Sequence, residues 1–335
     1  MINVMKLLIT REIPQAGINL LKDYPQIELD YRKGPPLSPD KLGKAIADVD
    51  AIIPVIPDQI SEEIIKSGKK LKIIAAYSVG YDNIAVPTAT KKKIYVANTP
   101  GDLTESVAEH SLALMMALGR RVCEGNAFCR AGKYKYWEPM EFIGPKFKGK
   151  TLGVIGFGRI GQQFGRMAKY GLEMDILYND PMSHPEAENL LDAKKVELDE
   201  LLENSDIVSV HCNLCEATYH LLGEQQFRKM KPNAFLINTA RGPIINEKNL
   251  VVALKENWIA GAALDVYEDE PTINAALKKM ANVVLTPHIA SATWEARIQM
   301  ATMAVNNVID VLIHNKPPRN LVNKELAEAN ISSLA

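Results

Sequence analysis

Three polar side chains in the second half of the chain combine residue types that could move a proton at a carbonyl group. Arg241 lies in INTARGPIIN, Glu270 in LDVYEDEP and His288 in TPHIASAT, each just after an apolar run that predicts a strand. A guanidinium can hold a carboxylate, an imidazole can donate a proton to a developing alkoxide, and a carboxylate bonded to the imidazole favours its protonated form. Taken singly, each residue has a structural alternative: a surface charge, a turn residue with Asp269 as its rival, and a capping or core histidine.

A G-x-G-x-x-G pattern, formed by Gly156, Gly158 and Gly161, stands where the apolar run 151–155 meets the amphipathic segment 159–169. In a dinucleotide site these glycines allow a tight turn, the approach of the pyrophosphate and close helix packing, and N–H groups at the helix end bind the phosphates. Glycine spacing alone is a weak signal, because a loop glycine can serve only to permit a positive φ. The strand and helix in register favour a nucleotide site.

Asp180 ends the next strand-like run, 174–178, nineteen positions after Gly161. An acid at this place accepts hydrogen bonds from an adenosine ribose and repels a 2′-phosphate. Residues 181–183 supply no Arg or Lys to receive such a phosphate, so the sequence predicts NAD rather than NADP. The alternative is that Asp180 only starts an Asp-Pro turn.

The predicted elements explain how these residues could converge. Strand-like runs at 206–210, 234–238, 260–264 and 283–286 complete a nucleotide domain of about residues 101–288. The carboxyl ends of the strands in a doubly wound sheet open on one face, so side chains that follow them can meet there.

The first hundred residues alternate short apolar runs with amphipathic stretches, which predicts a second parallel sheet wrapped by helices. This segment has no glycine fingerprint and is expected to be a partner domain. In the turn YSVGYD, the N–H groups of Val79 and Gly80 could take a small carboxylate; a simple turn is an equal alternative. A predicted helix, 291–315, returns the chain to this domain, which is therefore residues 1–100 with 289–335, and the tail from Pro317 is expected to be an extended strap.

Residues 102–121 predict one long helix, near whose start Thr104 could face a cofactor or cap the helix. Residues 122–149 break the pattern with glycines and prolines and are expected to protrude as an aromatic segment suited to a subunit contact or to packing on the same chain. The aromatic residues that this segment is expected to present are Tyr134, Tyr136, Trp137, Phe142 and Phe147.

Composition excludes several classes of function. A chain of 335 residues favours two domains, and 39 basic against 40 acidic residues give no electrostatic case for nucleic acid or an anionic membrane. No stretch approaches the ~18 apolar residues of a membrane span, and no secretory signal is visible, so a cytoplasmic location is expected. Cys212 and Cys215 form C-x-x-C beside His211, but no second pair at finger-like spacing accompanies them. Packed or loop thiols are favoured, with no metal.

The chain resembles the D-isomer-specific 2-hydroxyacid dehydrogenases over almost its whole length, most closely the glyoxylate/hydroxypyruvate reductases of archaeal type. The segments that carry the resemblance are YSVGYDNI (77–84), NTPGDLTESVAEHSLALMMALGRR (98–121), GKTLGVIGFGRIGQQF (149–164), FLINTARGPIINEKNLVVAL (235–254), GAALDVYEDEP (261–271) and VVLTPHIASAT (283–293).

The resemblance implies a Rossmann-type nucleotide domain and a flavodoxin-like substrate domain with a cleft between them. It implies that Arg241, Glu270 and His288 are catalytic and that the amides of Val79 and Gly80 hold the substrate carboxylate together with Arg241. It also implies a homodimer with an arm at about 122–149, whose Trp137 is donated to the neighbouring subunit. The implied cofactor contacts are Thr104, Gly156, Gly158, Arg159, Ile160, Gly161, Asp180, Thr239, Ala240, Asp265 and His288, with Asp265 near the nicotinamide amide.

Two segments depart from the family pattern. HCNLCEAT carries Asn213 and Cys215 where relatives often have Pro and Thr, which puts the adenine-side loop in doubt. HIASAT carries Ala290 where Gly is usual, a methyl group near the cofactor that is expected to modulate affinity.

The resemblance predicts NADH-dependent reduction of glyoxylate first and hydroxypyruvate second, with the reverse reaction on D-2-hydroxy acids. The alternatives are a D-lactate or 3-phosphoglycerate dehydrogenase, or a weakly active NAD-sensing interaction protein.

Overall fold

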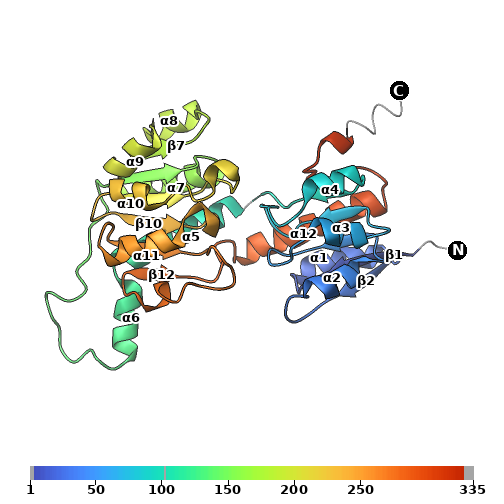
Figure 1. Cartoon of the computed structure of the whole chain (residues 1–335), viewed down its shortest axis with the longest axis horizontal. Coiled ribbons are helices and arrows are strands. Elements are labelled where there is room, and N and C mark those ends of the chain that lie inside the picture. Colours follow the sequence, from blue (N-terminus) through green and yellow to red (C-terminus); the bar gives the residue numbers. More distant parts are fainter. Residues whose placement is uncertain (1–3, 102, 328–335) are drawn as a thin grey trace. The chain divides into compact units, whose positions relative to one another are not determined.

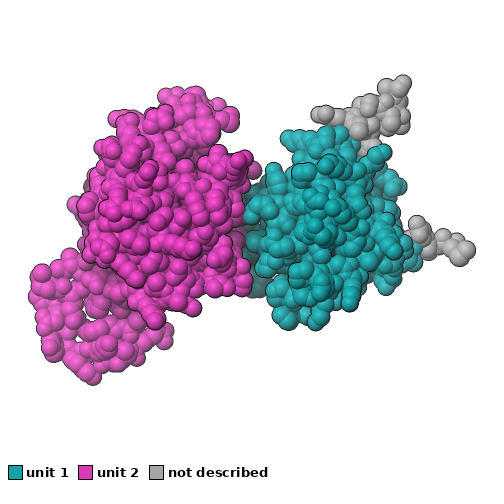
Figure 2. All heavy atoms as spheres, in the orientation of Figure 1, with its two compact units in different colours: residues 1–103, 293–335 teal, residues 104–292 magenta. Residues whose placement is uncertain are grey.

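The computed structural model describes residues 4–101 and 103–327. The chain forms two compact units: residues 1–103 with 293–335, called unit 1, and residues 104–292, called unit 2 (Figure 2). Each unit contains one parallel sheet flanked by helices, so the predicted α/β class with two doubly wound sheets is confirmed (Figure 1). The predicted start of the long helix, Asp102, lies outside the described residues.

The sheet of unit 1 has the strand order β2-β1-β3-β4-β5, which is the flavodoxin-like order. Its strands are β1 (Met5–Ile9), β2 (Ile27–Tyr31), β3 (Ala51–Ile53), β4 (Ile73–Ala75) and β5 (Tyr95–Ala97). Its helices are α1 (Gln15–Leu20), the 3-10 turn η1 (Leu21–Asp23), α2 (Pro39–Ile46), α3 (Glu62–Ser67), α4 (Val86–Lys91) and α12 (Trp294–Leu312).

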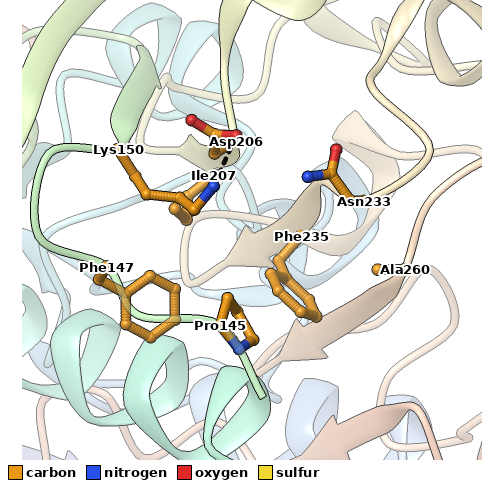
Figure 3. Close-up of a pocket in the computed structure, with 8 residues that line it drawn as sticks. All are labelled: Pro145, Phe147, Lys150, Asp206, Ile207, Asn233, Phe235 and Ala260. Carbon is orange, nitrogen blue, oxygen red and sulfur yellow. Dashed lines mark hydrogen bonds and ion pairs between the residues drawn. The ribbon is translucent and has the colours of Figure 1, made fainter. Parts of the chain in front are cut away.

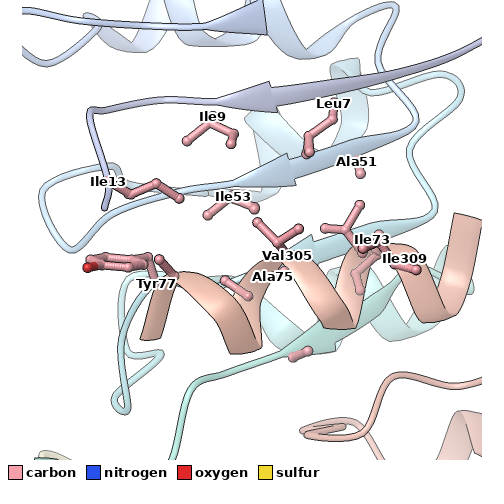
Figure 4. Close-up of a cluster of buried hydrophobic side chains, with 14 of the residues drawn as sticks. Leu7, Ile9, Ile13, Ala51, Ile53, Ile73, Ala75, Tyr77, Val305 and Ile309 are labelled. Carbon is pink, nitrogen blue, oxygen red and sulfur yellow. The ribbon is translucent and has the colours of Figure 1, made fainter. Parts of the chain in front are cut away.

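Successive side chains of these strands enter opposite layers, as the pleat requires. Leu7 and Ile9 of β1 belong to the core under α1 and α12, whereas Leu8 belongs to the core under α2, α3 and α4. Figure 4 shows α12 lying across the first of these cores. Gly17 lets α1 approach α12 closely, because a Cβ atom there would lie 2.8 Å from the Ala301 backbone.

The tail after α12 runs back along the sheet edge as a strap. Leu321 forms an antiparallel bridge with Ala97, and Val322 donates its N–H to the Val96 carbonyl at 2.8 Å. The Asn323 side chain accepts from the Val96 N–H at 2.9 Å and donates to the Ile94 carbonyl at 3.0 Å. These bonds fasten the strap to β5.

The sheet of unit 2 has the strand order β12-β11-β10-β9-β6-β7-β8, which is the Rossmann order extended by one strand. Its strands are β6 (Thr151–Ile155), β7 (Asp175–Asn179), β8 (Lys194–Lys195), β9 (Ile207–Val210), β10 (Phe235–Asn238), β11 (Gly261–Leu264) and β12 (Val283–Leu285). Its helices and 3-10 turns are α5 (Leu103–Gly119), α6 (Val122–Arg130), α7 (Arg159–Leu172), α8 (Pro185–Leu191), α9 (Leu198–Asn204), η2 (Glu216–Thr218), α10 (Glu224–Lys229), η3 (Gly242–Ile244), α11 (Glu247–Lys255) and η4 (Leu277–Lys279).

Unit 2 also buries side chains on both faces of its sheet. Helices α5, α7 and α8 cover one core, and α9, α10 and α11 cover the other. From β6 the sheet continues through β7 and β8 on one side and through β9 to β12 on the other. The strand order therefore reverses between the neighbouring strands β6 and β9. Ligands of such sheets bind at this switch point, beyond the carboxyl ends of the strands.

The segment 122–149 differs from its prediction in two respects. Residues 122–130 form the helix α6, although none of its residues is buried. Phe147 is buried against Gly119 in the core of unit 2, so it is not part of a presented aromatic surface. Phe142 is half-buried and packs edge-on against Phe128.

Candidate active site

The three fingerprint glycines have different surroundings at the turn from β6 into α7. Gly156 has φ +88°, and a Cβ atom there would overlap the backbone of Cys212, two residues after β9. A Cβ atom at Gly161 would overlap the Gly156 carbonyl oxygen. Gly158, by contrast, is exposed and faces open space. Two glycines therefore close the turn, and the third leaves room for a ligand to approach the backbone.

The first turn of α7 suits an anion. The helix begins at Arg159 after Gly158, whose position offers no side-chain cap for the first N–H groups. Arg159 is exposed and Ile160 is half-buried beside this end. Free N–H groups at a helix start attract phosphate oxygens, as the dinucleotide prediction requires.

Asp180 is held in place by the turn itself. Its Oδ2 atom accepts the N–H of Phe157 at 2.8 Å, and its Oδ1 atom accepts the N–H of Met182 at 2.9 Å. A carboxylate has about four acceptor positions, so each oxygen keeps capacity for a ribose hydroxyl. The open approach at Gly158, the start of α7 and the fixed carboxylate of Asp180 together fit an NAD molecule.

Thr239 and Ala240 follow β10 at the same end of the sheet. The Thr239 hydroxyl lies 2.9 Å from the Ser111 hydroxyl, and the Ala240 N–H donates to the Asn238 side chain at 3.0 Å. Thr104 is half-buried on α5. The backbone of this turn is thus fixed before any ligand binds.

His288 and Glu270 form a pair. The Nδ1 atom of His288 lies 2.8 Å from Oε2 of Glu270, and the Tyr267 N–H donates to the other oxygen, Oε1, at 3.0 Å. The side chains of His288 and Glu270 are 23% and 30% exposed. Because Glu270 holds Nδ1, the Nε2 atom faces away from the carboxylate. This hydrogen bond favours Glu270 over Asp269 as the partner of the imidazole.

Asp265 secures the backbone that carries His288. Its carboxylate is fully buried; Oδ1 accepts from the Ile289 N–H at 2.9 Å and from the Thr286 hydroxyl at 2.6 Å, and Oδ2 accepts from the Ala290 N–H at 2.8 Å. His288, between these anchors, has φ +55°, a left-handed conformation that is uncommon for a residue with a side chain.

The second histidine near this loop, His110 of α5, lies behind Asp265. Its Nε2 atom is 3.2 Å from the Thr286 hydroxyl and 3.5 Å from Oδ1 of Asp265. Burial alone raises the pKa of Asp265, but the hydrogen bonds from His110, Thr286 and the backbone outweigh it and lower the pKa. The carboxylate is therefore held charged.

Arg241 lies in a turn that packs closely against the loop of Glu270. A Cβ atom at Gly242 would overlap the backbone of Tyr267 and Glu268, so only glycine permits this contact. The guanidinium donates to the Ala240 carbonyl at 2.8 Å, and the Arg241 carbonyl accepts from the Asn238 side chain at 2.9 Å. The structure thus brings the predicted catalytic segments of Arg241, Glu270 and His288 together in unit 2.

Several residues that support this arrangement were not singled out by sequence reasoning. Glu247 and Glu268 exchange hydrogen bonds between side chain and backbone N–H, at 2.7 and 3.1 Å. His220 lies 2.7 Å from the Glu268 carboxylate. Burial raises the pKa of Glu247. The sequence shows the Glu-x-Glu spacing of Glu268 and Glu270. The pairing of Glu268 with Glu247 spans about twenty residues and has no local sequence pattern.

In unit 1, the turn after β4 presents Val79 and Gly80. The Val79 carbonyl accepts from the Asn98 side chain at 2.8 Å, and the Gly80 carbonyl accepts from the Ser78 hydroxyl at 2.6 Å. Val79 is exposed. Both carbonyls are therefore engaged, and within residues 4–101 and 103–327 neither N–H is bonded to a backbone carbonyl.

Trp137 lies in unit 2, in the long loop after α6 that Figure 1 shows extending from the body of the unit. Its side chain is 75% exposed, and Tyr134, Tyr136, Met140 and Ile143 are also exposed. The described part of this loop therefore presents a large apolar surface to solvent.

A pocket in unit 2 lies at the opposite ends of the strands from this chemistry. Figure 3 shows Lys150, Asp206 and Ala260, which immediately precede β6, β9 and β11, around it with Phe147 and Phe235.

All four cysteines are free thiols. Among the residues that the structure describes, no group of three metal-binding side chains is found and no helix is long and apolar enough to cross a membrane.

Comparisons with known proteins identify the family of this chain. Residues 112–290 match the family model described as D-isomer specific 2-hydroxyacid dehydrogenase, NAD binding domain. The chain is 47% identical over 326 residues to a glyoxylate reductase of Thermococcus litoralis, covering 96% of this chain and 97% of that relative.

Two solved structures have the same fold throughout. A Thermus thermophilus protein matches with a TM-score of 0.89 and 37% identity, covering 95% of this chain and all of that chain. A glyoxylate reductase of Paecilomyes thermophila matches with a TM-score of 0.84 and 30% identity, covering 96% and 99%. The chain therefore belongs to the D-isomer specific 2-hydroxyacid dehydrogenases and is an NAD-dependent oxidoreductase of that family.

Proposed function

We propose that this enzyme reduces glyoxylate with NADH, and hydroxypyruvate as a second substrate, and that it oxidises the corresponding D-2-hydroxy acids in reverse. The hydrogen bond between His288 and Glu270 carries the proposal, because it equips an imidazole to donate a proton to a carbonyl oxygen. The extent and identity of the match to glyoxylate reductases support the choice of substrate.

When bound, NADH would supply the hydride for the carbonyl carbon. His288 donates a proton from Nε2 to the carbonyl oxygen, while Glu270 accepts the Nδ1 proton in a hydrogen bond and keeps the ring oriented. Arg241 binds the carboxylate of the substrate, since a guanidinium can make two parallel hydrogen bonds to it. We assign the same carboxylate to the N–H groups of Val79 and Gly80, whose carbonyls are already held by side chains.

The cofactor contacts that we propose all lie in unit 2. Gly156, Gly158, Gly161, Arg159 and Ile160 would surround the pyrophosphate, Asp180 the adenosine ribose, and Thr104, Thr239, Ala240, Asp265 and His288 the nicotinamide half. The open space at Gly158 and the fixed carboxylate of Asp180 support this assignment. The absence of Arg or Lys at 181–183 supports NAD over NADP.

We further propose that residues 101–288 are the nucleotide domain, that residues 1–100 with 289–335 are the substrate domain, and that the enzyme is a homodimer. The exposed apolar loop 134–143 would be part of the subunit contact, and Trp137 would reach the neighbouring site. A cytoplasmic location remains the expectation, supported by four free thiols.

The test is an NADH-oxidation assay on the purified protein with a panel of 2-oxo acids: glyoxylate, hydroxypyruvate, pyruvate and a phosphorylated 2-oxo acid. We expect the highest kcat/KM for glyoxylate and the second for hydroxypyruvate. A preference for pyruvate or for the phosphorylated acid would replace the substrate proposal. Binding of NADH without turnover of any acid would favour an NAD-sensing protein instead.

A further inference from the structure

We propose that His184 is a positioning residue that fixes the Asp180 carboxylate and thereby strengthens the preference for NADH over NADPH. This inference rests on the proposed cofactor site and adds a residue to it. His184 lies four positions after Asp180, just before α8, in a segment that the sequence reasoning did not use.

The imidazole of His184 is held by an aromatic pair and by an amide. Its ring packs edge-on against Phe157 and Tyr178, with centroid distances of 5.9 Å to each, and these two rings stack on one another at 4.2 Å. The Gln162 amide nitrogen donates to the Phe157 carbonyl at 2.7 Å and lies 3.2 Å from Nδ1 of His184. The amide is a donor, so Nδ1 accepts, and the proton of the neutral ring is on Nε2.

That Nε2 atom is buried and makes no hydrogen bond in the part of the chain that the structure describes. It lies 3.5 Å from Oδ1 of Asp180, slightly beyond ordinary hydrogen-bond distance. A buried donor without a partner is costly, so a small movement that brings Nε2–H onto the carboxylate is favourable. Glu188 is the other nearby charge; it accepts from the Tyr178 hydroxyl and lies 3.4 Å from the His184 backbone nitrogen.

The consequence concerns which nucleotide can bind. With the N–H groups of Phe157 and Met182 bonded to it and the His184 imidazole beside it, the carboxylate of Asp180 would be held facing the ribose. A fixed negative charge at that point binds two ribose hydroxyls and repels a 2′-phosphate. Removing the imidazole donor leaves the carboxylate freer to rotate. This weakens its hydrogen bonds to the ribose and reduces its repulsion of a 2′-phosphate.

Two substitutions separate this role from simple packing. His184→Phe keeps a ring between Phe157 and Tyr178 but removes the donor. His184→Gln loses the ring but can place an amide N–H near the position of Nε2. His314→Phe serves as the matched control, because His314 is an exposed histidine in unit 1 that also packs edge-on against a tyrosine.

The measurement is the Kd of NADH and of NADPH for each full-length protein without substrate, by titration of cofactor fluorescence. We expect His184→Phe to weaken NADH binding by about threefold to tenfold, the value of one hydrogen bond, and to lower the NADH preference over NADPH by a similar factor. His184→Gln should recover most of the NADH affinity, and kcat at saturating NADH should change less than twofold or so in either variant. Thermal unfolding verifies that each variant is folded.

Unchanged Kd values in His184→Phe would overturn the inference. Equal losses of NADH affinity in the Phe and Gln variants would also overturn it, because they would show that only the ring shape matters. If the wild type binds NADH but does not reduce glyoxylate, the proposed substrate is wrong, and the Kd comparison still decides the role of His184. A wild type that binds no NADH would overturn both.

Discussion

Replacing Asp265 by asparagine removes one charge and almost no volume from the buried anchor of the His288 loop. The carboxylate accepts three hydrogen bonds, from the N–H groups of Ile289 and Ala290 and from the Thr286 hydroxyl. An asparagine has only one acceptor oxygen, so its NH2 group must face at least one of these donors. The substitution therefore removes one hydrogen bond, weakens the others and places the NH2 group opposite another donor.

The magnitude follows from the number of bonds lost. A hydrogen bond to a charged group contributes about 1.5–3 kcal/mol, and a buried donor left without an acceptor costs about 1–3 kcal/mol. Because the loop can relax around a smaller set of bonds, we expect the free energy of unfolding to fall by about 2–4 kcal/mol. At about 2–4 °C per kcal/mol for a domain of this size, Tm should fall by roughly 5–15 °C.

The same variant has a pH signature. The pKa of Asp265 is lowered in the folded protein, so its charge contributes stability above the unfolded pKa of about 3.9, and the contribution is lost as pH falls through the folded value. The difference in stability between wild type and Asp265→Asn should be full at pH 7 and shrink below about pH 4.

Calorimetry or denaturant unfolding measures the stability, and NADH oxidation with glyoxylate measures the second effect. We expect kcat to fall as well, since His288 loses the backbone anchors that hold its left-handed conformation. Asp269→Asn is the control, because Asp269 is exposed in the neighbouring loop. A loss of less than about 1 kcal/mol with near-native kcat would refute the role of Asp265 as an anchor.

The fingerprint glycines, Arg241 and Glu270 give three further predictions. Gly158→Ala should change the free energy of unfolding by no more than about 0.5 kcal/mol, since its surroundings are open, yet weaken NADH binding about tenfold. Gly161→Ala should lower the free energy of unfolding by about 1–3 kcal/mol, because its Cβ atom would overlap the Gly156 carbonyl oxygen. Equal stability of the two variants would contradict this difference. Arg241→Lys should lose about 100-fold in kcat/KM for glyoxylate despite keeping its charge, and a near-native value would exclude the carboxylate clamp. Glu270→Gln should reduce kcat by about 10–100-fold, because an amide replaces the carboxylate that orients the imidazole of His288. A near-native kcat would remove Glu270 from the proton path.

Local patterns were sufficient to predict most of the fold. The predicted strand 151–155 coincides with β6, and the predicted strand 206–210 contains β9, because short apolar runs between turn residues leave few alternatives. The helix α6 was missed because it buries none of its residues and contains Gly125, so it has neither apolar periodicity nor strong helix propensity.

Contacts between distant segments could not be predicted in this way. Phe147 was expected to protrude, but it packs against Gly119, where the lack of a side chain makes room for its ring. In the site, the pairing of His288 with Glu270 agrees with the roles inferred from residue types. The contact of His110 with Asp265 joins residues more than a hundred positions apart and has no local signal.

The most direct test of the proposed mechanism is a crystal structure of the enzyme with NAD and a non-reacting 2-oxo acid analogue such as oxamate. We expect Nε2 of His288 within about 3 Å of the oxygen that replaces the substrate carbonyl, with the Arg241 guanidinium on the analogue's carboxylate. A complex in which His288 lies away from the nicotinamide ring, or in which Arg241 points into bulk water, would contradict it.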